Sequence, residues 1–265
     1  MKQFILNEEP DKDNLVRLRN KDYHYLVKVR RLAVGEYFSA LLPDGKEAQV
    51  KVISINKEIL TGECNIDTTH SPAPHSPFPA PLILFQALPK GNKMDLIVRQ
   101  AAEGGIAEIV PFVSEFSEAK KQASDIKISR WERIIKEARQ QSGSKIATTI
   151  RSPLSLNELI DYWKSLPGAA GLLFHHLGVE QNSLHEYLYN IDKTPKVSAP
   201  KVLVIGPEGG FSDAEAALFV KNGFKPFTIG NTILRTETAA LYCAAAVKII
   251  LLEKDKWQLI NKNLN

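Results

Sequence analysis

Two short loops contain the residue types that could do chemistry in this chain. The first is Gly206-Pro-Glu-Gly-Gly210, which follows the apolar run Lys201–Ile205 and precedes Ser212-Asp-Ala-Glu215. The run predicts a buried strand and the Ser-x-x-Glu pattern predicts a helix start. In open α/β sheets, ligands bind beyond the carboxyl ends of strands. Because glycines allow close backbone approach and Pro207 stiffens the turn, this loop is a candidate cofactor site. The alternative is a tight turn that binds nothing.

The composition of the first loop disfavours the common nucleotide sites. Its glycines at 206, 209 and 210 match neither G-x-G-x-x-G nor G-x-x-x-x-G-K-[ST]. Glu208 would also repel a phosphate group placed beside it. An enzyme of the Rossmann type or with a P-loop is therefore not supported.

The second loop repeats the same plan further along the chain. The strand-like run Pro226–Ile229 is followed by Arg235-Thr-Glu-Thr238, where the pattern predicts the start of a helix over Glu237–Glu253. Free backbone N–H groups point out of a helix N-terminus, so these polar side chains and the first loop could line one pocket. Thr236 or Thr238 could instead be an ordinary N-cap, but that explanation does not account for Arg235.

The surrounding sequence predicts how these loops are positioned. Five prolines between Ser71 and Pro81 exclude a helix or a central strand and predict an extended linker. Before the linker, short alternating runs predict a small β-rich module, and after it strand and helix patterns alternate, which favours a mostly parallel sheet covered on both faces. The expected strands of the module are Tyr37–Leu42, Ala48–Ile55 and Ile59–Cys64. Ser-x-x-Glu boxes predict helix starts at Ser129, Ser155, Ser183 and Ser212.

Charge and length limit the classes of function. The chain has 265 residues and a formal net charge of +4, with six basic residues against one acidic residue in Leu15–Arg31 and nine against three in Lys120–Arg151. Two basic patches suit a polyanion such as nucleic acid, although solvated helix and loop faces would look the same. No apolar run approaches the ~20 residues that cross a bilayer. The start of the sequence turns acidic too soon for a signal peptide, so we expect a soluble, cytoplasmic protein that does not bind a membrane.

Cysteines and histidines do not predict a metal site. Cys64 and Cys243 are the only cysteines, which excludes a disulfide scaffold and a thiolate cluster. His175-His176 follows the apolar run Ala170–Phe174, where one of the two could reach the pocket edge, but no further ligand stands at a zinc-like spacing. We expect no metal.

Several motifs together resemble one family. Gly206-Pro-Glu-Gly-Gly210 and Ile233-Leu-Arg-Thr-Glu-Thr-Ala239 are similar to the corresponding loops of the RsmE family of ribosomal RNA methyltransferases, in the SPOUT superfamily. The similarity extends over almost the whole chain, through His24–Arg31, Lys90–Asp95, Glu108–Pro111 and Arg130–Arg133. One departure is Ser144-Lys145, where family members often carry an arginine after the Gln-Ser of the middle helix.

The resemblance implies a fold, a cofactor and partners. It implies an α/β fold with a C-terminal trefoil-knotted SPOUT methyltransferase domain over residues 73–265 and a PUA-like β-barrel domain that binds RNA over residues 1–72. It implies S-adenosylmethionine as the methyl donor, a homodimer, and N3-methyluridine in 16S ribosomal RNA of the small ribosomal subunit as the product.

The resemblance also suggests which residues act. Arg235 could stabilise negative charge on the target base, and Glu237 could accept a proton or hold the cationic part of the cofactor, as could Glu208. The expected cofactor-binding residues are Gly206, Pro207, Glu208, Gly209, Ile229, Gly230, Leu234, Thr236 and Thr238. The expected RNA-binding residues are Arg17, Arg19, Lys28, Arg30, Arg31 and Lys145.

Two rival functions stay open at this point. One is an RNA-binding protein without catalysis, in which the glycine loops are only turns. The other is a SPOUT methyltransferase that acts on another RNA position, either a ribose 2′-OH or a base of transfer RNA.

Overall fold

The computed structural model describes residues 4–43, 45–66, 80–117, 125–175, 183–191 and 199–262. Side chains are described up to residue 253 in the last helix. The contacts divide the chain into two compact units, one of Met1–His75 with Arg139–Ala147 and one of Ser76–Ala138 with Thr148–Asn265. Each unit is described by itself below.

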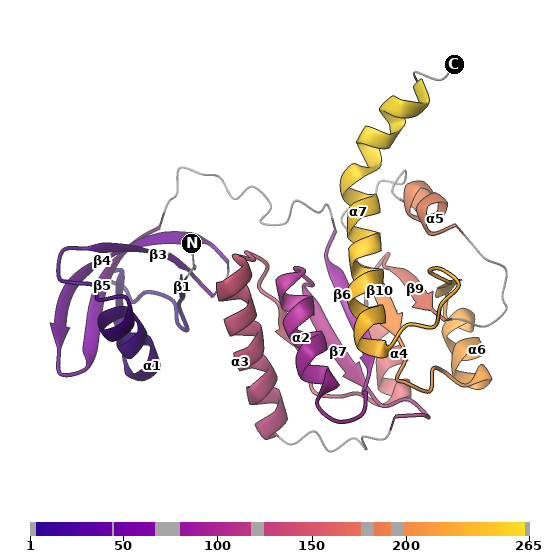
Figure 1. Cartoon of the computed structure of the whole chain (residues 1–265), viewed down its shortest axis with the longest axis horizontal. Coiled ribbons are helices and arrows are strands. Elements are labelled where there is room, and N and C mark those ends of the chain that lie inside the picture. Colours follow the sequence, from indigo (N-terminus) through magenta and orange to yellow (C-terminus); the bar gives the residue numbers. More distant parts are fainter. Residues whose placement is uncertain are drawn as a thin grey trace. The chain divides into compact units, whose positions relative to one another are not determined.

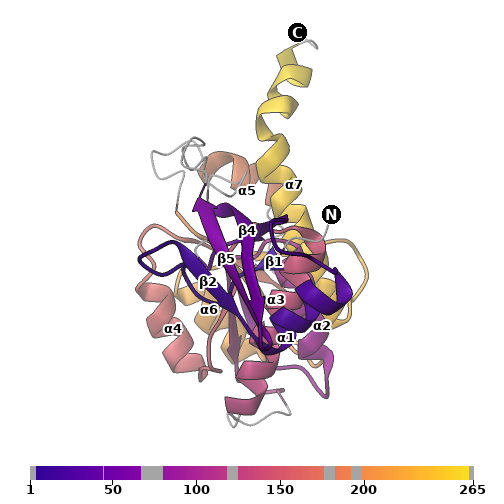
Figure 2. The same cartoon turned by 90° about the vertical axis from the view of Figure 1, so that its left-hand side faces the viewer.

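The first unit is built on a curled five-stranded sheet, seen in Figure 2 with α1 at its side. The strands lie in the order β1-β3-β4-β5-β2, and all pairs are antiparallel except β1 with β3. Side chains such as Phe38 and Val50 fill its core. The predicted β-rich module is confirmed. The strands are β1 (Phe4–Ile5), β2 (Leu15–Leu18), β3 (Tyr37–Leu41), β4 (Glu47–Asn56) and β5 (Ile59–Ile66).

A short helical segment joins β2 to β3. One turn of α-helix, α1 (Asn20–Tyr23), continues as a π-helix, η1 (His24–Val29). Within η1, Leu26 is fully buried and Lys28 is exposed, and Arg30 directly after it is exposed as well. Arg31 follows with a φ of 57°, in the left-handed region. A π-helix is rare and is frequent at functional sites, so this basic segment has a specific shape that its sequence did not predict.

The second unit is built on a six-stranded sheet in the order β11-β9-β10-β6-β7-β8, and every pair is parallel. The alternation of strand and helix patterns predicted a mostly parallel sheet, and this prediction is confirmed. Because the strands are parallel, the loops after β9, β10 and β11 leave the sheet at the same edge. The strands are β6 (Leu82–Ala87), β7 (Glu108–Phe112), β8 (Thr149–Ile150), β9 (Ala170–Phe174), β10 (Lys201–Ile205) and β11 (Lys225–Phe227).

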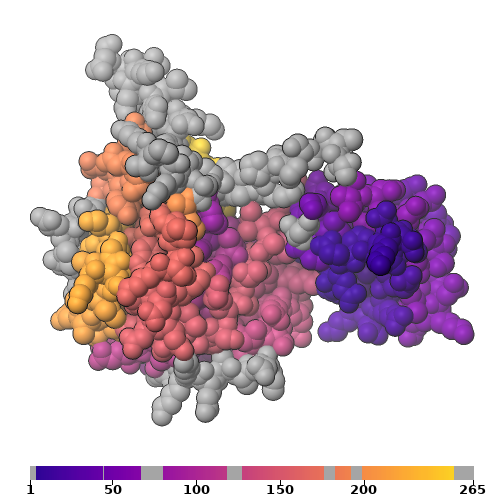
Figure 3. All heavy atoms as spheres, turned by 180° about the vertical axis from the view of Figure 1, so that it is seen from behind, coloured from indigo at the N-terminus to yellow at the C-terminus, as the bar shows by residue number. Residues whose placement is uncertain are grey.

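Helices cover both faces of this sheet. Leu82 and Leu84 of β6 face one core, formed with α2, α3, α5 and α7, and Figure 1 shows α2 beside α7. Ile83 and Phe85 face the opposite core, formed with α4 and α6, whose outer surface is visible in Figure 3. Alternate residues of a strand point to opposite faces, so β6, which is apolar except for Gln86, is buried on both sides. The helices are α2 (Lys93–Glu103), α3 (Asp125–Ser142), α4 (Leu156–Lys164), α5 (Leu184–Ile191), α6 (Asp213–Lys221) and α7 (Thr236–Lys262).

Helix starts were predicted with one error. Ser155 and Ser212 each form a complete capping box, and the backbone N–H of Glu186 donates to Ser183 Oγ at 3.2 Å. The box at Ser129 is wrong as a helix start, because α3 already begins at Asp125. Ile128 packs against the same core as Trp131, so helical packing extends to the N-terminal side of Ser129. Tertiary burial outweighs a local capping signal.

No helix within the described ranges is long and apolar enough to cross a membrane.

Candidate active site

The two predicted loops meet at one edge of the parallel sheet. The first follows β10 and the second lies between β11 and α7. The hydroxyl of Thr236, the first residue of α7, donates to the backbone carbonyl of Gly206 at 2.6 Å. One hydrogen bond therefore joins the start of the glycine loop to the start of the last helix.

A cavity of about 330 Å³ lies between these loops. Ligand sites in proteins commonly measure ~300–1,000 Å³. Its wall combines backbone of the glycine loop with apolar side chains from the ends of the strands and from α7, which is a mixed surface suited to a small organic ligand. The lining residues are Phe174, His175, Ile205, Gly206, Pro207, Glu208, Gly209, Gly210, Phe211, Phe227, Thr228, Ile229, Thr232, Ile233, Leu234, Thr236, Ala239 and Cys243.

The structure brings most of the predicted cofactor residues to this cavity. Seven of them line it: Gly206, Pro207, Glu208, Gly209, Ile229, Leu234 and Thr236. Gly230 and Thr238 are not among its described lining residues, and neither are the two predicted catalytic residues, Arg235 and Glu237. All four belong to the loop after β11 or to the first turn of α7. They are therefore neighbours in sequence of residues that line the cavity, but they do not line it themselves.

Arg235 and Glu237 differ in their surroundings. Arg235 is exposed, and no ion pair from it is recorded within the described residues. Its backbone carbonyl accepts the first helical hydrogen bond, from the N–H of Ala239 at 2.8 Å. Glu237 is half-buried, and its Oε2 atom is buried without a hydrogen-bond partner in the part of the chain that the structure describes. Within those residues, Arg235 is therefore a cation without a recorded ion pair, and two positions further along the chain Glu237 Oε2 can still accept a hydrogen bond.

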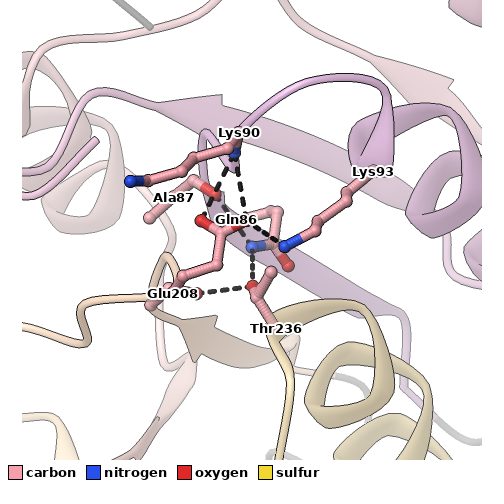
Figure 4. A network of polar contacts seen from close by, with 7 residues as sticks. Gln86, Ala87, Lys90, Lys93, Glu208 and Thr236 are labelled. Atoms are coloured by element: carbon pink, nitrogen blue, oxygen red, sulfur yellow. Dashed lines mark hydrogen bonds and ion pairs between the residues drawn. The ribbon is translucent and has the colours of Figure 1, made fainter. Parts of the chain in front are cut away.

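Glu208 is held from outside the cavity by the segment that follows β6. Its carboxylate accepts from Lys93 Nζ at 2.5 Å and from the backbone N–H of Lys90 at 3.2 Å, as Figure 4 shows. Partial burial alone would raise the pKa of Glu208, but the hydrogen bonds from Lys93 and Lys90 and the lysine charge outweigh it, so the pKa lies below its usual value. Glu208 is thus a paired carboxylate near neutral pH, which makes it a poor proton acceptor.

Thr236 is not simply a helix cap. Its hydroxyl accepts from Gln86 Nε2 at 3.0 Å and donates to Gly206, so both functions of the oxygen are used in tertiary contacts. Gln86 was missed by the sequence reasoning. The available signal was a polar residue inside the otherwise apolar run of β6, because buried amides are nearly always part of a hydrogen-bond network.

The sequence placed one of His175 and His176 at the pocket edge, and His175 lines the cavity, whereas the lining residue Cys243 was not predicted. His175 lies against Phe211, with ring centroids 6.0 Å apart, and Cys243 is buried in α7. Burial raises the pKa of Cys243 to about 12. Among the described residues no group of three His, Cys, Asp or Glu side chains could hold a metal ion, and His176 lies outside those residues.

The six predicted RNA-binding residues are all exposed and belong to the first unit. Arg17 pairs with Asp11 at 2.8 Å, and Lys145 pairs with Glu47 at 2.8 Å. Arg19, Lys28, Arg30 and Arg31 have no recorded ion pair within the described ranges. Among these six residues, those without a recorded ion pair therefore lie in η1 and in the segments that flank α1 and η1.

Comparison with known proteins identifies this combination of fold and site. Residues 76–248 match the model of an RNA methyltransferase domain, and residues 18–63 match the model of an RNA methyltransferase PUA domain. The class defined by the parallel sheet and its cavity is thus that of RNA methyltransferases, with a PUA domain in front.

Relatives specify the family further. The chain is 31% identical over 241 residues to ribosomal RNA small subunit methyltransferase E of Aquifex aeolicus, covering 89% of this chain and 95% of the relative. It is 29% identical over 255 residues to ribosomal RNA small subunit methyltransferase E 2 of Borreliella burgdorferi, covering 95% and 98%. The chain belongs to the ribosomal RNA small subunit methyltransferase E family, and the resemblance found in the sequence is confirmed.

A solved structure supports the same fold. A ribosomal RNA small subunit methyltransferase E from Neisseria gonorrhoeae, bound to S-adenosylmethionine, superposes with a TM-score of 0.76 at 25% identity, covering 94% of this chain and 98% of that one. The predicted α/β fold with a PUA domain is thereby confirmed.

Proposed function

We propose that this chain transfers a methyl group from S-adenosylmethionine to N3 of a uridine in 16S ribosomal RNA of the small ribosomal subunit. The observation that carries the proposal is the cavity between the loop after β10 and the start of α7, joined by the bond from Thr236 to Gly206. The cavity lies at the sheet edge where α/β proteins bind ligands. The relatives named above and the S-adenosylmethionine in the Neisseria structure support the choice of substrate and donor.

The cavity fits the cofactor in size and in chemical character. The residues that would hold it are Gly206, Pro207, Glu208, Gly209, Ile229, Gly230, Leu234, Thr236 and Thr238. Glycine backbone offers hydrogen bonds at close approach, and apolar walls such as Ile229 and Leu234 accept an aromatic ring. When bound, S-adenosylmethionine supplies an electrophilic methyl group on a positively charged sulfur.

Arg235 and Glu237 carry the catalytic roles in this proposal. Methylation of uridine at N3 replaces the N3 proton, so negative charge develops on the base and a proton must leave it. Arg235 is exposed and without a recorded acid partner in the described residues, and it stabilises the charge on the base oxygens. Glu237 Oε2, which lacks a donor in the described residues, accepts the proton. Glu208 was the other candidate proton acceptor, and its ion pair with Lys93 argues against that role.

The first unit holds RNA in this proposal. Residues 1–72 form a PUA-like β-barrel domain and residues 73–265 a trefoil-knotted SPOUT domain. The curled sheet of the first unit is compatible with a small barrel. The packing of α7 on β6 and β10, beside the glycine loop, is compatible with the knot. The RNA contacts assigned are Arg17, Arg19, Lys28, Arg30, Arg31 and Lys145.

We further propose a homodimer that works in the cytoplasm. Apolar side chains of α7 such as Leu241, Tyr242 and Ile249 are exposed, as is Leu96 of α2. A second, largely apolar cavity of about 240 Å³ lies between these two helices. A second copy of the chain would cover both features. Light scattering at micromolar concentration should give twice the monomer mass, and the monomer mass would contradict the dimer.

The reaction is tested by nucleoside mass spectrometry. Small-subunit RNA lacking the modification is incubated with the protein and S-adenosylmethionine and then digested to nucleosides. We expect 3-methyluridine to appear. A ribose-methylated nucleoside or another methylated base would replace the N3 assignment. Calorimetry that detects no binding of S-adenosylmethionine would instead favour an RNA-binding protein without catalysis.

A further inference from the structure

Gln86 is a fully buried polar residue in an otherwise apolar central strand. It has no exposed surface, and in the sheet it lies beside Ile205 of β10, the residue directly before Gly206. Gln86 therefore lies on the strand next to the one that leads into the glycine loop. A polar residue at such a position needs hydrogen bonds to offset its desolvation.

The hydrogen bonds of Gln86 have a defined direction. Its Nε2 group donates to the carbonyl of Ala87 at 2.9 Å and to Thr236 Oγ1 at 3.0 Å, which uses both amide hydrogens. Because Thr236 accepts from Gln86, its single hydroxyl hydrogen is available for the carbonyl of Gly206, at 2.6 Å. Figure 4 shows this chain of bonds from β6 to the start of α7.

Contacts within the glycine loop couple the direction of the Gly206 carbonyl to the position of the rest of the loop. A Cβ on Gly206 would lie 3.3 Å from backbone atoms of Gly210, so the two ends of the loop are packed against each other. The N–H of Gly210 also donates to the carbonyl of Pro207 at 2.9 Å. A change in the direction of the Gly206 carbonyl would therefore move the whole turn that lines the cavity.

We propose that Gln86 is a positioning residue for the methyl-transfer reaction. It orients the Thr236 hydroxyl, which holds the Gly206 carbonyl and so presets the loop Gly206–Gly210 for the cofactor. In this assignment Thr236 acts through the loop, because its hydroxyl is already engaged on both sides. The inference rests on the proposed binding of S-adenosylmethionine in this cavity.

The bonding of Gln86 distinguishes this role from simple stabilisation. Its Oε1 atom is buried and has no partner among the described residues. An unmade hydrogen bond offsets much of what the two made bonds contribute to stability. Leucine, which has a similar volume, should therefore fold about as well at this position, whereas the direction of the Thr236 hydroxyl would be lost.

The experiment is a double-mutant cycle on the full chain. Calorimetry measures the affinity for S-adenosylmethionine of the wild type, Gln86→Leu, Thr236→Val and the double variant. We expect each single change to weaken binding about tenfold, the order of one net hydrogen bond. The double variant should bind no more weakly than Thr236→Val alone, because both changes break the same chain of bonds. Thr236→Ser, which keeps the hydroxyl, should bind within about twofold of the wild type.

Thr148→Val is the matched control. Thr148 is buried, and its hydroxyl donates to the carbonyl of Ile106 at 2.7 Å, away from the cavity. This variant should lose thermal stability to a similar extent as Thr236→Val but keep the cofactor affinity of the wild type. In steady-state kinetics, Gln86→Leu should raise KM for the cofactor and leave kcat within about threefold of the wild type.

The outcomes separate this inference from the function on which it rests. A wild-type protein that does not bind S-adenosylmethionine refutes the proposed function. If the wild type binds, wild-type affinity of Gln86→Leu, or additive losses in the double variant, would overturn the positioning role. Should Gln86→Leu fail to fold, Gln86→Met keeps the unbranched shape of the side chain but has no donor, and it should show the same tenfold loss. Normal affinity of Gln86→Met would equally overturn the role.

Discussion

Lys93 and Glu208 form an ion pair of 2.5 Å between the first turn of α2 and the glycine loop. Both side chains are partly exposed, and the carboxylate also accepts the backbone N–H of Lys90. The pair fastens one wall of the candidate active site to the start of α2, and the bond from Lys90 fastens it to the loop after β6. The charge of Lys93 keeps Glu208 ionised, which limits Glu208 to a structural and electrostatic role.

This pair predicts a pH dependence of stability. The pKa of Glu208 is lowered in the folded protein from an ordinary value of 4.5. A carboxyl with a lowered pKa stabilises the folded state above its unfolded pKa, and this contribution disappears as the pH falls through the folded pKa. Glu208→Gln should therefore cost up to about 1 kcal/mol at pH 7 and progressively less below pH ~4.5. Thermal melts between pH 3 and pH 7 measure the difference.

The control for that series is Glu103→Gln. Glu103 is an exposed carboxyl at the last residue of α2, the helix that begins with Lys93. It should shift the melting temperature little at any pH. A Glu208→Gln difference that is as large at pH 3 as at pH 7 would show that the charge pair is not its origin.

Arg235→Ala should separate catalysis from folding. The side chain is exposed, so its removal should change stability by no more than about 0.5 kcal/mol. Loss of one group that stabilises developing charge typically costs ~10²–10³ in turnover. We expect methylation at saturating cofactor to fall by that factor while calorimetry shows unchanged affinity for S-adenosylmethionine. A variant that methylates at the wild-type rate would remove Arg235 from the mechanism, and joint loss of stability and cofactor affinity would indicate a role in shaping the loop.

The basic segment around η1 should contribute salt-dependent RNA affinity. Arg30 and Arg31 are exposed and have no recorded ion pair in the described residues, so phosphates can approach them. Replacing both with Ala should weaken RNA binding and lower the salt slope by ~0.7–0.9 for each phosphate that these arginines neutralise in the wild type. The matched variant Lys164→Ala with Lys221→Ala removes two exposed charges elsewhere and should leave the slope unchanged. If both double variants weaken RNA binding and lower the salt slope equally, the effect comes from net charge and not from phosphate contacts at Arg30 and Arg31.

Cys243 should be unreactive in the native protein. It is buried, and this burial raises the pKa of its thiol to about 12. The thiolate is the reactive form, so alkylation by iodoacetamide at pH 8 should be slow. Burial also raises the pKa of Cys64, the second free cysteine. Mass spectrometry should find both cysteines unmodified in native protein and both modified after denaturation; rapid native labelling of Cys243 would mean that the cavity opens to solvent along α7.

Gly209→Ala should disturb the rim of the cavity. A Cβ at this position would lie 3.0 Å from Phe116 Cβ, so the phenylalanine or the loop must shift. Segment Ser114–Glu115 resists such a shift, because the buried Glu215 carboxylate accepts the N–H of Glu115 at 2.9 Å. Because Phe116 is exposed rather than packed in a core, we expect a loss of only about 1 kcal/mol in stability, together with weaker cofactor binding. Phe116→Gly removes the Cβ at 3.0 Å, so the double change Gly209→Ala with Phe116→Gly should lose less stability than the sum of the two single changes if the steric clash is the cause.

The sequence by itself determined most of the elements and their succession along the chain. Apolar runs, Ser-x-x-Glu boxes and glycines act over a few residues, so they predicted most strands, most helix starts and the two loops that line the cavity, but not β1, β2 or the helical segment of α1 and η1. The alternation of strand and helix also predicted a parallel sheet, because such connections permit few other arrangements. Motifs of the two loops indicated the family, and the comparisons confirmed it.

Only the tertiary structure decided which side chains act together. Gln86 and Thr236 are 150 positions apart, and Lys93 and Glu208 are 115 apart. Their contacts depend on the strand order that places β6 beside β10, which no local pattern contains. The same long-range packing started α3 before Ser129 and kept Arg235 and Glu237 out of the cavity wall. Hydrogen bonds and close packing act over a few ångströms in space, whereas sequence patterns record only neighbours along the chain.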